Sequence, residues 1–141
     1  MNSDDLKRRT KSFALRIIRL VESLPPGTVA NVIGRQLAKC GASVGANYRA
    51  ACRAKSNVDF IAKMGIVEEE ADESIYWMEL LVESELMRKE RIEDLMDEAD
   101  QLTSIFVSSI NTDRGNKRGI IFKLSFYGQL LTSIVIYTAQ I

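Results

Sequence analysis

Apolar residues recur at intervals of three and four along the first 110 residues, the period of helices that bury one face. The first such segment, residues 5–24, ends at two prolines, because proline cannot continue a helix. Its apolar stripe consists of Leu6, Phe13, Ile17, Leu20, Val21 and Leu24. We expect Thr28 to be the N-cap of the next helix.

Three further segments of similar length carry the same period. We predict helices over residues 29–54, 58–82 and 87–110, joined by short polar connections. Four amphipathic helices with short connections are typical of an up-down four-helix bundle. The sequence shows no internal repeat, and no strand-like alternation precedes residue 119. The predicted fold class is therefore all-α.

The C-terminal part of the chain departs from this pattern. Residues 111–119 are polar and turn-prone, and an apolar segment rich in β-branched and aromatic residues follows. We therefore divide the chain into a bundle domain, 1–112, and a C-terminal extension, 113–141. Residues 124–141 lack charge and approach the length of a membrane span, but their glutamines, glycine and hydroxyl residues weaken that interpretation. We expect this segment to pack on the bundle or on another subunit, and no membrane partner.

On a helical wheel, the second predicted helix has a flank of small residues beside its core stripe. Two glycines inside a helix cost roughly 1 kcal/mol each relative to alanine, and close packing of another helix offsets this cost. Packing inside the bundle accounts for the glycines, and we also assign Gly41, Gly45, Trp77 and Leu81 to an interface between copies of the chain. For Trp77, a subunit contact and a wide apolar bundle face are equally good explanations.

A third face of the same helix is basic, and its cations fall within an arc of roughly 80°. The candidate nucleic-acid-binding residues are Arg35, Lys39, Arg49, Arg53 and Lys55. Residues 1–55 carry eleven Lys/Arg and three Asp/Glu, whereas the rest of the chain carries eight and sixteen. Such a face can contact phosphates without reading bases, or it can pair with acidic helices of the same or an adjacent subunit. Charge alone leaves both alternatives open.

Residue types exclude most familiar enzyme chemistry. The chain has no histidine, which removes the commonest general base and the usual imidazole metal ligand. Cys40 and Cys52 lack CxxC spacing and the N-terminus carries no secretory signal, so we expect free thiols in a cytoplasmic protein. The acidic run at 68–73 lacks the Glu-x-x-His motif of di-iron bundles, and GASVGAN lacks the ending of a phosphate loop. We expect no enzymatic activity, metal or cofactor.

Three motifs within about residues 6–110 resemble a known family. They are the run Gly-x-Ser-x-Gly-Ala-Asn at 41–47, the pair Asp59-Phe60, and the block Glu73-Ser74-x-Tyr76-Trp77. This pattern resembles the bacterial four-helix bundle family of intervening-sequence proteins, named for open reading frames inserted in 23S ribosomal RNA genes. Residues 50–51 are both alanine where many relatives carry an acidic residue, which makes the neighbouring face more basic.

The resemblance implies a non-enzymatic homopentamer. It also implies a fold similar to that of the accessory variability determinant protein of diversity-generating retroelements, a basic pentamer that binds nucleic acid and a reverse transcriptase. The predicted function is thus binding of RNA or DNA by a homo-oligomer, with a reverse transcriptase or another protein as a further partner. The alternative is a structural or adaptor oligomer whose basic face pairs with Glu69, Glu70 and Glu73 of a neighbouring subunit.

Overall fold

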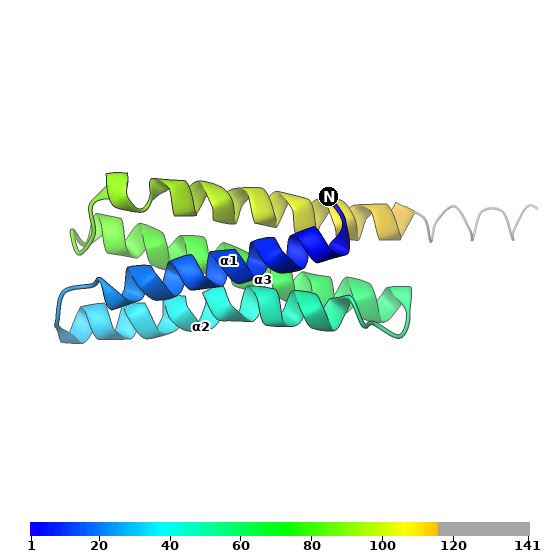
Figure 1. Cartoon of the computed structure of the whole chain (residues 1–141), viewed down its shortest axis with the longest axis horizontal. Helices are drawn as coiled ribbons and strands as arrows, with labels where there is room; N and C mark the ends of the chain where they lie inside the picture. The colour runs from blue at the N-terminus through cyan, green and yellow to red at the C-terminus, as the bar shows by residue number, and fades with distance from the viewer. Residues whose placement is uncertain (116–141) are drawn as a thin grey trace, which may run out of the picture. The chain divides into compact units, whose positions relative to one another are not determined.

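Residues 1–115 are those that the structure, a computed structural model, describes, and they are mainly helical (Figure 1). The helices α1 (Ser3–Glu22), α2 (Thr28–Ala51) and α3 (Asn57–Glu83) come first. The short 3₁₀ turn η1 (Lys89–Arg91) then leads to a fourth helix, which occupies residues 93–115. Within this part of the chain there is no strand. The prediction of an all-α four-helix bundle is confirmed.

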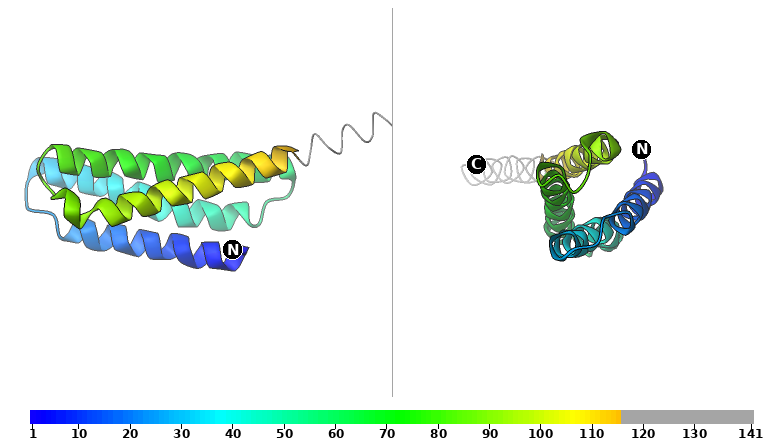
Figure 2. Two further views of the ribbon diagram at one scale, coloured as in Figure 1. Left: turned by 90° about the horizontal axis from the view of Figure 1, so that it is seen from above. Right: turned by 90° about the vertical axis from the view of Figure 1, so that its left-hand side faces the viewer.

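The four helices of the compact unit Met1–Ile110 surround a common core. Figure 2 shows α2 between α1 and α3, with the fourth helix on the remaining side. Every helix contributes fully buried apolar side chains at the spacing expected from the sequence. The largest of them include Phe13, Ile17, Leu37, Val44, Met64, Met78, Leu102 and Phe106.

Polar side chains fix the first turns of α1 and α3. The Asn2 side chain accepts a hydrogen bond from the Asp5 amide at 2.9 Å, and the Asp5 carboxylate accepts one from the Asn2 amide at 3.2 Å. At α3 the Ser56 hydroxyl oxygen accepts a hydrogen bond from the Asp59 amide at 3.1 Å. Each contact satisfies a helix amide that has no acceptor within the helix.

The start of α2 differs from the prediction. Gly27, with φ of 150°, is the N-cap, and Thr28 is already the first helical residue. No side chain caps this helix. The assignment of Thr28 as the cap was therefore wrong, because the chain leaves the two prolines through a positive-φ conformation that favours glycine.

The connection between α3 and the fourth helix is longer than predicted. Residues 87–92, expected to be the first turns of the fourth helix, instead form an extended link and η1. Glu85 has a positive φ of 61°, and the amides of Leu86 and Met87 both donate to the Leu81 carbonyl at 3.0 Å. Met87 and Ile92 are nevertheless buried. Apolar periodicity alone does not distinguish this arrangement from a continuous helix.

The end of the described chain also corrects a prediction. Residues 111–115, expected to form a turn, are helical. No proline separates them from the preceding helix, so the helix continues through their polar side chains. The predictions for the remainder of the C-terminal extension fall outside the described residues.

Candidate nucleic-acid interface

The five predicted nucleic-acid-binding residues are all exposed. Arg35, Lys39 and Arg49 lie on α2 opposite the buried stripe that includes Leu37 and Val44. The helix was predicted to reach residue 54, but it ends at Ala51. Arg53 and Lys55 therefore lie on the turns that follow it. We call the five cations the α2 basic face.

The α2 basic face has no counter-charge of its own. The α2 sequence contains no acidic residue. The four ion pairs found among residues 1–115 involve other cations. Three of the five side chains, those of Arg49, Arg53 and Lys55, lie at the C-terminal end of α2, where the helix dipole favours positive charge. The dipole is thus a structural reason for their presence that does not require a ligand.

The cation nearest the start of α3 has a local structural role instead. The Asp59 carboxylate accepts hydrogen bonds from the Lys63 ammonium at 2.5 Å and from the Lys55 amide at 3.1 Å. The Lys63 contact, followed by the Lys55 amide, lowers the pKa of Asp59. Only the backbone of Lys55 takes part, so its ammonium group remains on the surface.

The cations of α1 are partly neutralised within the bundle. Arg9 donates to both carboxylate oxygens of Glu98 on the fourth helix, at 2.7 and 2.9 Å, and to the Gln101 side chain at 2.9 Å. Lys7 and Arg8 pair with aspartates of their own helix. The cations of α1 without an ion pair in the described chain are Lys11, Arg16 and Arg19.

Acidic side chains occupy the exposed side of α3. Glu69 and Glu73 are exposed and Glu70 is half-buried. Burial raises the pKa of Glu70, the neighbouring carboxylate of Glu73 adds to the increase, and Lys39 of α2 opposes it. Lys39 therefore lies where the α2 basic face meets the α3 acidic face, which we define as Glu69, Glu70 and Glu73.

The small-residue flank of α2 packs against α1 of the same chain. A Cβ atom at residue 41 would overlap the Ile17 side chain, with Ile17 Cγ2 at 3.0 Å, and one at residue 45 would lie 3.4 Å from Thr10 Oγ1. Leu81 is fully buried in the core. Gly41, Gly45 and Leu81 are thus enclosed within one chain, which corrects their assignment to an interface between copies.

Trp77 is the one residue of that set that reaches the surface, and it is half-buried. Its indole Nε1 donates to Glu73 at 3.0 Å, and its ring meets that of Tyr76 edge-on, with centroids 5.1 Å apart. Tyr76 is 53% exposed. An aromatic pair therefore stands beside the α3 acidic face, and it retains the potential for contact with a partner.

Neither thiol occupies a setting that favours nucleophilic chemistry. Cys40 is buried in the core and accepts a hydrogen bond from the Ser74 hydroxyl at 3.2 Å. Burial is the main cause that raises the pKa of Cys40, so the reactive thiolate is disfavoured. Cys52 is half-buried at the C-cap of α2.

Sequence reasoning missed a second group of cations. Arg16 and Arg19 of α1 line a surface pocket together with Arg91, which lies in η1. Arg91 comes from a segment that was predicted to be regular helix, and its proximity to α1 depends on the connection that the periodicity did not reveal. No local motif marks this group.

The fold and its charged surface define a class: an antiparallel four-helix bundle with a basic face on one helix and an acidic face on the next. The sequence profile of the 23S rRNA-intervening sequence protein family matches residues 4–108, and the chain belongs to this family.

A solved structure supports the same assignment. The chain is similar to a protein of unknown function from the S23 ribosomal protein family of Bacteroides thetaiotaomicron, with 33% sequence identity and a TM-score of 0.67. The similarity covers 74% of this chain and 96% of the other. No curated protein matches the chain. Among the helices of the described part, none has the length and apolar character needed to cross a membrane.

Proposed function

We propose that this protein is a non-enzymatic homo-oligomer that binds RNA or DNA through the α2 basic face. The observation that carries the proposal is a row of five exposed cations, none of which forms an ion pair with another described residue. Unpaired arginines and lysines bind the phosphate backbone through charge and hydrogen bonding, independently of sequence. Tyr48, the aromatic residue nearest this face in the sequence, is buried, so base stacking has no support.

Assembly strengthens such binding. A homopentamer, the state that the resemblance implies, would present five copies of the α2 basic face. Weak contacts with several phosphates become tight when one strand reaches several copies at once. The half-buried Trp77 and exposed Tyr76 are the apolar groups of α3 that we assign to the contact between copies.

The test is nucleic-acid binding by filter retention or mobility shift across a salt series. The wild-type protein should bind without strong sequence preference and weaken steeply with salt, with a logarithmic slope of about 0.9 per neutralised phosphate of duplex DNA. The double substitution Arg49→Glu, Arg53→Glu should weaken binding and reduce that slope.

A matched control carries the same charge change elsewhere. Arg88→Glu, Lys89→Glu alters two exposed cations of the connection before the fourth helix, and it should leave most of the binding intact. Absence of binding at low salt, or equal loss in both double variants, would contradict the proposal.

The second candidate function is a structural or adaptor oligomer without nucleic-acid binding. It is favoured by the acidic face of α3, whose exposed Glu69 and Glu73 form no ion pair within the described chain. In this case the α2 basic face of one subunit pairs with the α3 acidic face of the next. Light scattering separates the two candidates: here Arg49→Glu, Arg53→Glu breaks the oligomer, whereas a nucleic-acid-binding face can be reversed without loss of assembly.

A further inference from the structure

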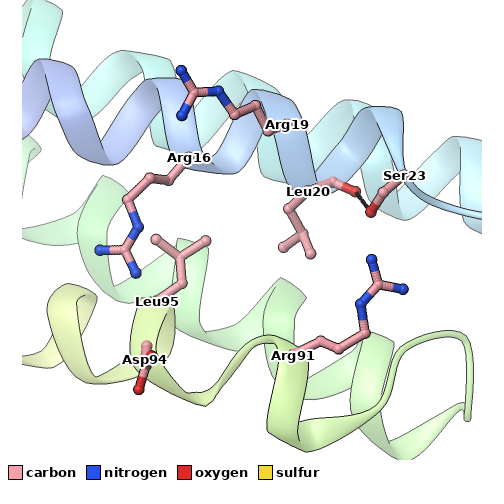
Figure 3. A pocket seen from close by; sticks show the side chains of 7 residues that line it. All are labelled: Arg16, Arg19, Leu20, Ser23, Arg91, Asp94 and Leu95. Atoms are coloured by element: carbon pink, nitrogen blue, oxygen red, sulfur yellow. Dashed lines mark hydrogen bonds between the residues drawn. The ribbon is translucent and has the colours of Figure 1, made fainter.

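A surface pocket of about 330 Å³ lies between the C-terminal half of α1 and the start of the fourth helix. Figure 3 shows the side chains of Arg16 and Arg91 extending into it from opposite sides, with Leu20 and Leu95 between them. Arg19 and Asp94 also border the pocket, but their charged groups point away from its centre. Two guanidinium groups thus face an apolar floor.

The two arginines lack compensation. Neither forms an ion pair with any residue in 1–115, and Asp94, the acidic residue of the lining, is not within ion-pair distance of either. Arg16 is half-buried, so its charge is less well solvated than that of a free side chain. An anion placed between the guanidinium groups would relieve their mutual repulsion.

The geometry also restricts the ligand. Guanidinium groups bind phosphate and carboxylate through paired N–H donors. A phosphate monoester carries a charge of about −1.5 to −2 at neutral pH, which matches two arginines better than a single carboxylate does. The volume is near the lower end of the range of small-molecule sites, about 300 to 1,000 Å³. The leucine floor suits an apolar or flat organic group.

We propose that this pocket binds a small phosphate monoester, with the phosphate held between Arg16 and Arg91 and the organic part on Leu20 and Leu95. The site is separate from the α2 basic face, because it is built from α1, η1 and the fourth helix. It does not depend on nucleic-acid binding. The hydroxyl of Ser23, at the rim, donates to the Leu20 carbonyl at 2.7 Å and keeps its lone pairs for a ligand.

The experiment is calorimetric titration of the full chain, at low salt and in a phosphate-free buffer. The probes are adenosine monophosphate, inorganic phosphate and succinate. We expect saturable binding of the monophosphate with one site per chain. Arg16→Gln and Arg91→Gln should each weaken it roughly tenfold or more, as loss of a charged hydrogen bond implies.

Two controls make the test selective. Arg19→Gln removes a cation from the same turn whose side chain points away, and it should leave the affinity unchanged. Arg49→Glu, Arg53→Glu should bind the monophosphate as the wild type does, even if it no longer binds nucleic acid. A similar loss in Arg19→Gln would show diffuse attraction and overturn the proposal, as would the absence of saturable binding in the millimolar range.

Two further readings cover the ligand class and the fold. Succinate binding as tightly as adenosine monophosphate would overturn the phosphate assignment. The monophosphate should also raise the melting temperature of the wild type above that in sodium chloride of equal ionic strength, since a ligand of the folded state stabilises it. Circular dichroism should show Arg16→Gln and Arg91→Gln folded. An equal rise in melting temperature for the double variant Arg16→Gln, Arg91→Gln would contradict the site.

Discussion

The two sides of α1 meet their neighbours by different means. Toward α2, the helix packs by shape, because Gly41 and Gly45 leave space for Ile17 and Thr10. Toward the fourth helix, the Arg9–Glu98 ion pair and the arginine-lined pocket are charged features of the contact. The difference teaches that one side of the helix is fixed by sterics and tolerates little change, whereas the other side can exchange partners.

The largest expected effect comes from filling the α1–α2 contact. Gly41→Leu would place a large side chain where even a Cβ overlaps Ile17, and the free energy of unfolding should fall by about 3 kcal/mol or more. Chemical denaturation measures it. The control is Gly65→Ala, because a Cβ there meets nothing within 4 Å. It should raise stability by up to about 1 kcal/mol through helix propensity. Similar destabilisation by both changes would contradict the steric account.

A double-mutant cycle tests the same contact at finer scale. Gly41→Ala should cost about 1 to 2 kcal/mol, since overpacking outweighs the gain in helix propensity. Ile17→Val removes the terminal methyl group that obstructs the new Cβ, and alone it should cost about 1 kcal/mol. The double variant should be more stable than the sum of the two changes predicts. Simple additivity in denaturant titrations would show that the two residues do not oppose each other.

The charged contact should contribute less. Arg9 and Glu98 are 27% and 17% exposed, so we expect a coupling energy of about 1 kcal/mol from the cycle Arg9→Gln, Glu98→Gln. High salt should reduce it. The matched control on the same helix is the exposed Arg8–Asp5 pair, which should give about 0.3 kcal/mol. A larger coupling for the control would reverse the assignment of Arg9 as the α1 cation that contributes most to stability.

The smallest effect depends on pH. Because burial raises the pKa of Glu70, the folded state holds its proton more tightly than the unfolded state, and stability falls as pH rises through the window above the ordinary value. Glu70→Gln should therefore raise the melting temperature at neutral pH, by well under about 1 kcal/mol in free energy since the group is partly solvated. Below the ordinary pKa of glutamate the two proteins should melt alike. A difference that persists in acid would exclude ionisation as the cause.

Much of the fold could be predicted from the sequence. The period of residues such as Phe13, Val44 and Met64 reports directly which side of a helix is buried. The starts of α2 and of the fourth helix could not be placed, since Gly27 and Glu85 take backbone conformations that side-chain periodicity does not encode. Apolar residues such as Met87 stay buried whether the connection is helical or extended.

The candidate site was predictable to a similar extent. The exposure of Arg35 and Arg49 follows from their place on the wheel, opposite the core. The pocket was not predictable, because Arg16 and Arg91 are far apart in sequence and meet only through tertiary structure. The same reason explains why Gly41 was assigned to a contact between copies: spacing shows that something packs closely, but it does not identify which helix does so.

The Arg9–Glu98 ion pair has a consequence for the order in which the bundle forms. Its partners are 89 residues apart, whereas α1 and α2 are neighbours in sequence and pack directly. Contacts between distant residues must overcome a larger loop-closure entropy, so α1 and α2 can form a hairpin well before the ion pair closes. During synthesis, Arg9 remains unpaired until the fourth helix has emerged. The contact thus marks completion of the bundle and not its nucleation.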